Sequence, residues 1–136
     1  MKIYAFVLSV PLIWSSAAIA QQRQQFDLVC QGTSTSKSGV KAEVERAWSD
    51  RIRIDLSTRQ WCKGTCFYVN SIADISSDEL KLNDKIGSVN SAEEILDRRT
   101  GTFRFEIGTS LAGGYFERGG GPCRIASFSG FPARKF

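Results

Sequence analysis

The residues of this sequence best suited to chemistry are its four cysteines, Cys30, Cys62, Cys66 and Cys123. Cysteine sulfur can hold a metal ion, exchange between thiol and disulfide, or cross-link the chain. A thioredoxin-type redox pair has two residues between its cysteines, whereas three separate Cys62 from Cys66. The sequence also lacks histidine, the commonest partner of cysteine in zinc sites. The choice between metal and cross-link then depends on the compartment.

The first twenty residues indicate an exported protein. They begin with Lys2, continue through an apolar run from Ile3 to Trp14, and end in the small residues Ala18–Ala20. This is the pattern of a cleavable signal peptide, and the run is too short for a membrane span of ~20 residues. We therefore expect residues 1–20 to be removed and residues 21–136 to form a single β-domain that is periplasmic or secreted and does not span the membrane.

An oxidising compartment favours disulfides, so we expect two bridges and neither a metal nor a cofactor. Four cysteines allow three pairings. On a straight strand the Cα atoms of Cys62 and Cys66 would lie ~13 Å apart, beyond the ~7 Å reach of a disulfide. A turn at the intervening Lys-Gly-Thr segment, which its glycine favours, would bring them together. This geometry favours Cys62–Cys66, which leaves Cys30 to pair with Cys123.

Two carboxylates are the next candidates, because Asp55 and Asp97 occupy equivalent places in a short internal sequence repeat, here called the internal echo. The segments 54–61 and 96–103 both read aliphatic, Asp, two residues, Thr, two residues, aromatic. The pair could serve as acid and base, one held protonated and the other ionised. The alternative is a recurring hairpin whose Asp accepts backbone N–H bonds. The hairpin explains every shared position, so it is the interpretation that we favour.

Aromatic side chains are the remaining candidates for a binding site. Trp48, Trp61, Tyr68 and Tyr115 lie in runs typical of strands, where they could line a cavity for an apolar ligand. In a domain of this size such residues more often fill the core. The formal charge of +4 is spread among acidic residues, which does not indicate nucleic-acid binding.

The elements that would position these residues are short strands. Alternation is clearest at Arg51–Leu56, where Ile52 and Ile54 point to one face and charged residues to the other. We expect strands at 26–32, 41–48, 51–56, 66–72, 79–82, 93–98, 102–107, 114–118 and 123–128, with 43–48 and 91–96 compatible with a turn or two of helix. Polar residues 33–39 and the glycine-rich segment 119–122 are expected to be a loop and a turn.

Strands in this number and with tight connections predict an all-β antiparallel meander, closed or nearly closed as a small barrel, with a β-sandwich as the alternative. A bridge between the first and last strands suits a barrel, where those strands become neighbours. The two disulfides would hold the domain together.

The Cys30, Trp61-Cys62, Asp97-Arg98-x-Thr100-Gly101 and Gly121-x-Cys123 pattern resembles that of small exported bacterial proteins with two disulfides. The short disulfide-bearing barrel is more distantly similar to lipocalin-like and periplasmic lysozyme-inhibitor domains. This resemblance implies no activity and no site residues. The sequence favours non-catalytic binding of a protein partner or a small apolar ligand, with a carboxylate-dependent envelope hydrolase or a purely structural surface protein as alternatives. It does not predict an oligomeric state.

Overall fold

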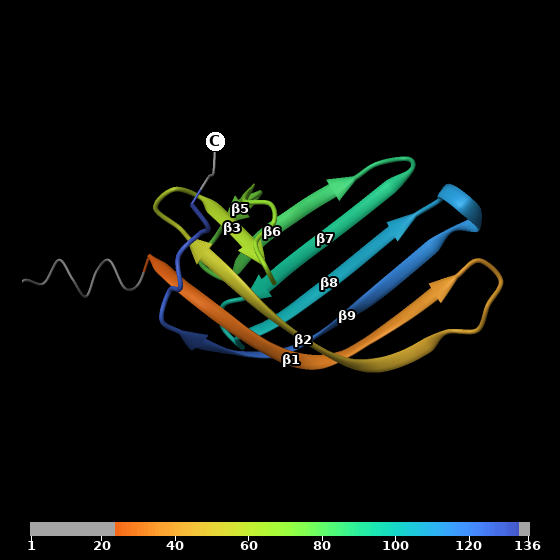
Figure 1. Ribbon diagram of the computed structural model, residues 1–136, viewed down its shortest axis with the longest axis horizontal. Coiled ribbons are helices and arrows are strands. Elements are labelled where there is room, and N and C mark those ends of the chain that lie inside the picture. The colour runs from red at the N-terminus through yellow and green to blue at the C-terminus, as the bar shows by residue number, and fades with distance from the viewer. Residues whose placement is uncertain (1–23, 134–136) are drawn as a thin grey trace, which may run out of the picture.

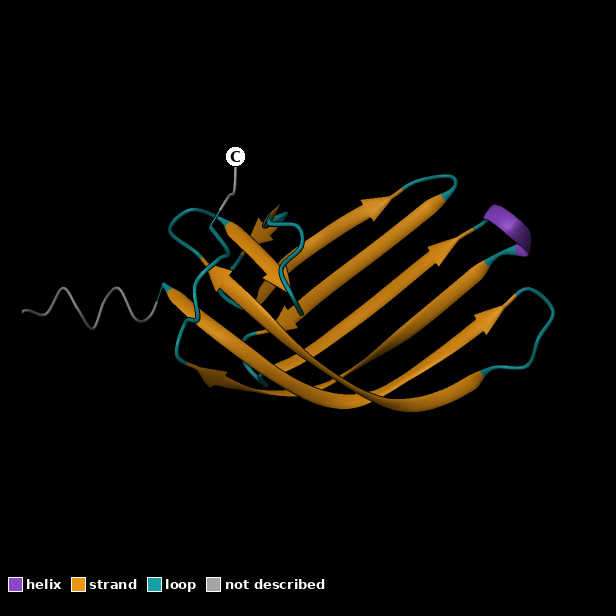
Figure 2. Ribbon diagram, viewed as in Figure 1, coloured by secondary structure: helices purple, strands orange, loops and turns teal. Residues whose placement is uncertain are grey.

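The alternating pattern forms antiparallel strands, as the computed structural model shows for residues 24–133, the part of the chain that it describes (Figures 1 and 2). These strands are β1 (Gln25–Ser38), β2 (Val44–Asp55), β3 (Gln60–Lys63), β4 (Asn70–Ser71), β5 (Asp74–Ile75), β6 (Glu79–Ile86), β7 (Asn90–Asp97), β8 (Thr102–Thr109) and β9 (Tyr115–Ala126). A single-turn 3-10 helix, η1 (Leu111–Gly113), joins β8 to β9. The all-β prediction is confirmed. The expected leader, residues 1–20, lies outside the described residues.

One nine-stranded sheet, in the order β4-β3-β2-β1-β9-β8-β7-β6-β5, curls into a half-barrel. Every hydrogen-bonded neighbour is adjacent in sequence except the pair β1 and β9, which joins the first strand to the last. The seam of the barrel therefore lies in the middle of the chain, between β4 and β5. The first and last strands, β1 and β9, pair with each other, and over the residues described the sheet is open only between β4 and β5. This is the nearly closed form of the predicted barrel.

The seam is bridged at one end of the half-barrel only. Between β4 and β5 the chain itself crosses it, with Ile72 N–H donating to the Arg59 carbonyl and Ala73 N–H to the Lys81 carbonyl, each at 2.9 Å. We call this the closed end. At the opposite, open end the hairpins β1–β2, β6–β7 and β8–β9 project (Figure 1). There the outer edge of β2 has no neighbour before Ile52 among the described strands, since β3 pairs only with Ile52–Asp55.

Two strands are longer than the sequence predicts. Most of segments 41–48 and 51–56 belongs to one strand, β2, although residues 41–43 lie in the loop before it, and most of segments 114–118 and 123–128 belongs to β9. The expected turn at 119–122 is therefore wrong, because these residues lie inside β9. Segments 43–48 and 91–96, for which helix was an alternative, are almost entirely strand.

The glycines of β9 mark a place where three backbones come close together. A Cβ at Gly120, whose φ is 149°, would lie 2.0 Å from the Phe103 carbonyl oxygen, and one at Gly121 would lie 2.0 Å from that of Gln31. On β1, a Cβ at Gly32 would meet the Gly120 carbonyl oxygen at 1.9 Å. Only residues without a Cβ allow this approach, so the glycine run serves the bend of the sheet rather than a turn.

Two further expectations about loops are corrected. Residues 33–38 are not a loop but continue β1, whose polar side chains lie beside β2 and β9. The expected strand 66–72 is mostly a loop, of which only Asn70 and Ser71 pair with β3. Cys66 begins this loop with a φ of 56°, a left-handed conformation that a straight strand does not contain.

The core fills the concave side of the sheet near the closed end. Its fully buried members come from strands on both sides of the β1–β9 pair and include Leu28, Ile52, Ile54, Trp61, Leu80, Leu82, Leu96, Phe103 and Phe105. The charged neighbours of Ile52 and Ile54 lie on the convex side, so the alternation of β2 orients this strand as predicted.

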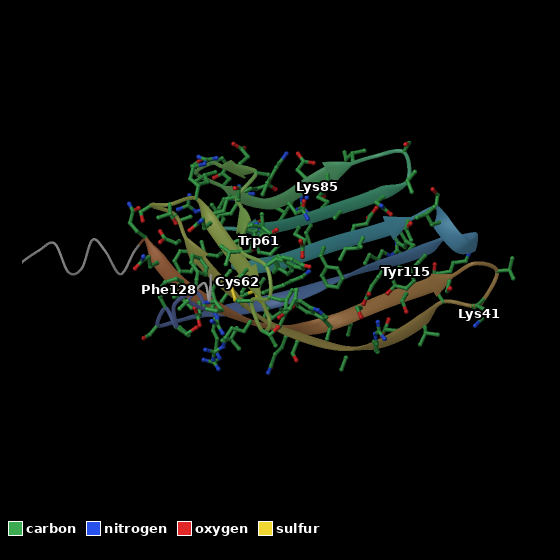
Figure 3. The ribbon with its side chains drawn as sticks, turned by 45° about the horizontal axis from the view of Figure 1, so that its top comes forward. Lys41, Trp61, Cys62, Lys85, Tyr115 and Phe128 are labelled. Atoms are coloured by element: carbon green, nitrogen blue, oxygen red, sulfur yellow. A yellow bond between two sulfur atoms is a disulfide. The ribbon has the colours of Figure 1, made fainter. Side chains whose placement is uncertain are left out.

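Both disulfides are present, in the pairing that the spacing favours. Cys30 and Cys123 face each other on β1 and β9, with Cα atoms 4.0 Å apart, and Cys62 and Cys66 close a short loop with Cα atoms 5.0 Å apart. Figure 3 shows Cys62 beside Trp61 near the closed end. Two disulfides are compatible with an oxidising environment.

The C-terminal segment after β9 covers part of the convex face. The fully buried carboxylate of Asp27 accepts hydrogen bonds from the Ser129 hydroxyl at 2.7 Å and from the Arg51 guanidinium at 3.1 Å. The Arg53 guanidinium donates to the Gly130 carbonyl at 2.8 Å. A buried charge is costly unless it is paired in this way, so Asp27 fixes the segment on the sheet.

Candidate ligand-binding site

An apolar hollow of about 520 Å³ lies at the closed end. We call it the mouth cavity. It is lined by residues from four strands and the turns beside them, namely Phe26, Leu28, Leu56, Leu80, Leu96, Asp97, Arg98, Gly101, Cys123 and Ile125. Its volume lies within the ~300–1,000 Å³ range of small-molecule sites.

The walls of the mouth cavity are built from cross-strand pairs. Leu28 on β1 lies opposite Ile125 on β9, and Leu80 on β6 lies opposite Leu96 on β7. Leu28, Leu80 and Leu96 are at most 5% exposed, whereas Ile125 is 74% exposed. The cavity thus has a buried aliphatic floor and an aliphatic rim that reaches solvent, an arrangement suited to an apolar ligand that enters from outside.

Both turns of the internal echo lie at this end, and each uses its aspartate in the same way. Asp55 Oδ1 accepts the N–H groups of Ser57 at 2.9 Å and Thr58 at 3.1 Å. Asp97 Oδ1 accepts the corresponding N–H groups of Arg99 and Thr100 at 2.8 and 3.1 Å. The hairpin interpretation of the echo is confirmed.

Acid–base work by this pair would need one carboxyl to stay protonated, and neither environment provides that. Burial raises the pKa of Asp55, but hydrogen bonds from Ser57, Gln25 and Thr58 outweigh it, so the pKa lies below its ordinary value. The N–H groups of Thr100 and Arg99 likewise lower the pKa of Asp97. Both groups are therefore ionised at neutral pH, and each is occupied by its own turn.

The rim of the mouth cavity carries one well-placed cation. Arg98 follows Asp97 in the β7–β8 turn, and its guanidinium donates to the Ser76 carbonyl at 2.5 Å. Its backbone N–H donates to the Asp78 carbonyl at 2.8 Å. The side chain is thus held beside the aliphatic walls, where its remaining donors can meet an acceptor group on a ligand.

The four aromatic residues expected to bind ligand are not brought together. Trp48 stacks on Phe103, with ring centroids 5.7 Å apart, and belongs to the core. Trp61 is 2% exposed and is also a core residue; its Nε1 has no hydrogen-bond partner in the described part of the chain. Tyr68 is 72% exposed and packs edge-on against Phe67, whose centroid is 4.7 Å away. None of these three lines the mouth cavity.

Tyr115, the fourth aromatic candidate, lies near the open end (Figure 3). It lines a smaller, mostly apolar hollow of about 290 Å³ together with residues such as Lys85 and Ile107. Its hydroxyl donates to Glu117 Oε2 at 2.5 Å, and Arg46 reaches the other Glu117 oxygen at 3.1 Å. The bond from Tyr115 is the main reason why the pKa of Glu117 is lowered. This residue therefore belongs to a polar network at a different place in the half-barrel.

Sequence reasoning also missed an ionic cluster on the concave face between the two ends. Lys63 on β3 contacts Glu94 on β7, whose side chain is 3% exposed, and Asn83 reaches the second Glu94 oxygen at 3.4 Å. Burial is the main cause of the raised pKa of the neighbouring Asp50. The signal was available, because Glu94 lies two positions from the core residue Leu96 and must therefore face the same side of the strand.

Two kinds of feature are absent from the part of the chain that the structure describes. Residues 24–133 contain no group of three or more His, Cys, Asp or Glu side chains that could hold a metal ion. The same part of the chain has no helix of the length and apolar character needed to cross a bilayer.

Comparison of the chain with known protein families, with curated protein sequences and with solved structures gives no match.

Proposed function

We propose that this protein is a non-catalytic binding protein that holds a small apolar ligand in the mouth cavity. The observation that carries the proposal is a 520 Å³ hollow with mainly aliphatic walls at the closed end of the half-barrel. Burial of apolar ligand surface contributes roughly 25 cal/mol per Å², which is enough for useful affinity without any reactive group.

The rim narrows the class of ligand. The walls are leucine, isoleucine and phenylalanine, and the polar groups at the opening include the cation of Arg98. A ligand with an aliphatic body and one terminal acceptor, such as a carboxylate, would place its body on the walls and its acceptor at Arg98. The nearby Asp97 carboxylate is occupied by the N–H groups of its turn, which limits its repulsion of such an acceptor.

The proposal also includes the compartment in which the protein works. The expected leader at residues 1–20 and the two disulfides both support work outside the cytosol, in the periplasm or after secretion.

The test is binding of a fluorescent probe with an apolar body and an anionic end, anilinonaphthalene sulfonate, with dodecanoate as the competitor. We expect the chain from Gln21 onward to bind the probe and dodecanoate to displace it. Ile125→Glu places a charge on the exposed rim of the cavity and should weaken binding about tenfold or more, since a desolvated charge opposes an apolar ligand.

Val69→Glu is the matched control, because Val69 is also partly exposed but lies in the β3–β4 loop and does not line the mouth cavity. It should bind the probe as the unmodified chain does. Leu56→Trp, which fills the cavity from its rim, should lower probe binding without adding charge. Equal binding by all four proteins, or no displacement by dodecanoate, would show that the mouth cavity is not the site.

A further inference from the structure

Exposed aliphatic side chains gather at the open end of the half-barrel, far from the mouth cavity. Three loops meet there, residues 39–43 between β1 and β2, 87–89 between β6 and β7, and 110–114 between β8 and β9. We call them the tip surface. Each loop or its flanking strand ends carries large exposed aliphatic residues, namely Val40 (104% exposed), Val44 (59%), Ile86 (84%), Val89 (41%) and Leu111 (59%). Such a group on one end of a small domain indicates a surface that meets an apolar phase or a partner.

The three loops form one connected surface. The Gly39 N–H donates to the Gly114 carbonyl at 2.8 Å, which joins the first loop to the third. The Ser110 N–H donates to the Val89 carbonyl, also at 2.8 Å, which joins the third loop to the second. Contacts between loops that lie far apart in sequence hold the aliphatic side chains in a fixed arrangement.

Three backbone N–H groups at the tips are also satisfied within the loops. Gly87 N–H donates to the Asn90 carbonyl at 3.0 Å, Gly114 N–H to the Leu111 carbonyl at 3.0 Å, and Leu111 N–H to the Thr109 hydroxyl at 3.2 Å. Unpaired backbone groups are expensive where water is scarce. Loops that bond to themselves and to one another therefore tolerate partial removal from water better than open loops would.

The charge and residue types favour a lipid surface over a protein as the occupant. Among the loop residues only Lys41 and Glu43 are charged, and most of the others are glycine, alanine, serine or a single aliphatic side chain. The three loops contain no arginine, a cation that is enriched among the residues that anchor protein interfaces. Lys37 and Lys85 are set back on the strands, where long cationic side chains can reach lipid headgroups while the tips go deeper.

We propose that the tip surface docks this protein on a lipid bilayer. Val40, Val89 and Leu111, one from each loop, insert into the boundary between headgroups and acyl chains, to a depth on the order of 5–10 Å. Attachment is peripheral and reversible, and it depends on apolar burial more than on charge. It uses the end of the half-barrel opposite the mouth cavity, so it does not depend on the ligand-binding proposal.

The experiment is flotation of the purified chain from Gln21 onward with vesicles of phosphatidylcholine, and with vesicles of phosphatidylcholine containing phosphatidylglycerol. This chain contains every described strand and both disulfides but lacks the apolar run Ile3–Trp14, which would bind lipid by itself. We expect flotation with both kinds of vesicle and only a modest increase with the anionic lipid.

The test variant is Val40→Ser/Val89→Ser/Leu111→Ser, which removes one aliphatic side chain from each loop. Because burial of one such side chain is worth roughly tenfold in partitioning, the triple change should weaken vesicle binding about a hundredfold or more. Phe67→Ser is the control, since Phe67 is 82% exposed but lies in the β3–β4 loop, and it should float as the unmodified chain does. Circular dichroism and a cooperative urea unfolding transition would show that the triple variant is folded.

Three outcomes would overturn the proposal. The first is failure of the unmodified chain to float with either vesicle. The second is equal loss of flotation in Phe67→Ser and the triple variant. The third is a concentration-dependent dimer in sedimentation that the triple variant abolishes, which would assign the tip surface to a second copy of the chain.

Discussion

At the scale of single residues, the two aspartates of the internal echo were compatible with two roles, an acid–base pair or a turn-stabilising hydrogen-bond acceptor. Carboxylates repeated in equivalent places could have been an acid–base pair. Their oxygens instead accept the N–H groups of the residues two and three positions later, at Asp55 and at Asp97 alike. Neutralising such a carboxylate should therefore affect stability and its pH dependence.

For the buried Asp55 we predict a stability effect whose sign follows from its lowered pKa. A carboxyl with a lower pKa in the folded chain stabilises the fold above its unfolded pKa of about 4, and this contribution is lost as the pH falls through the folded value. Asp55→Asn should lower the free energy of unfolding by about 1 to 2 kcal/mol at pH 7. The difference from the unmodified chain should shrink as the pH falls below about 4. Urea unfolding at a series of pH values measures both.

The exposed Asp74 of β5 offers a comparison at the same substitution. Asp74→Asn should change the free energy of unfolding by less than about 0.5 kcal/mol at pH 7, as surface substitutions usually do. If Asp55→Asn and Asp74→Asn lose the same free energy of unfolding at every pH, the hydrogen bonds that Asp55 accepts in its turn do not stabilise the fold.

At the scale of elements, the sequence predicted strand character well and strand length poorly. Alternation placed Ile52 and Ile54 on the buried face of β2, because burial on one side of a sheet imposes a period of two. Polar and glycine-rich segments predict breaks between strands, but residues 33–38 continue β1 and residues 119–122 lie inside β9. The glycines of β9 are required by the close approach of neighbouring backbones, which becomes visible only when the strands are assembled. The polar end of β1 is strand because it lies between two partners.

Substitution of one glycine tests whether this close approach is required. Gly120→Ala should lower the free energy of unfolding by about 3 kcal/mol or more, because its Cβ would lie 2.0 Å from the Phe103 carbonyl oxygen at a strained φ. Gly108→Ala on β8 is the comparison, since the nearest atom to its Cβ is the Ser91 hydroxyl oxygen at 3.1 Å, a side chain that can rotate. It should cost less than about 1 kcal/mol. Thermal unfolding monitored by circular dichroism compares the two.

The candidate site was also only partly predictable at this scale. The sequence suggested a cavity in a small barrel but assigned it to aromatic residues. Large rings such as Trp48 and Trp61 instead fill the middle of the barrel, where they bury the most apolar surface. The walls of the mouth cavity are mainly aliphatic residues from β1, β6, β7 and β9, and their convergence depends on the sheet curling. Periodicity gives the face of each residue, whereas the strand order decides which faces meet.

At the scale of the whole molecule, the two disulfides are expected to differ in their contribution to stability. Cys30–Cys123 closes a loop with a sequence separation of 93 residues, and Cys62–Cys66 one of four. In the chain-entropy model the long loop stabilises by ~4 to 5 kcal/mol and the short one by ~2 kcal/mol. Among the strands of residues 24–133, the long bridge also joins the only pair that is not adjacent in sequence.

Removal of each bridge in turn checks this ranking. Cys30→Ala/Cys123→Ala should lower the free energy of unfolding about twice as much as Cys62→Ala/Cys66→Ala, as measured by urea unfolding. All four replaced cysteines are at least partly buried, so the two double variants both create small cavities and each partly controls for the other. A larger loss from the Cys62/Cys66 variant would show that the short loop matters for packing rather than for chain entropy.

The pairing of β1 with β9 also sets the order in which the molecule can be completed. During synthesis, β1–β4 and β5–β8 can each form a ladder of neighbouring hairpins, but β9 alone contacts both β1 and β8. Until residues 115–126 emerge, neither ladder has the strand that pairs with both of them. β9 is therefore the strand that joins the two ladders into one sheet. We expect a chain truncated before β9 to be degraded by proteases rather than to form a smaller version of the fold.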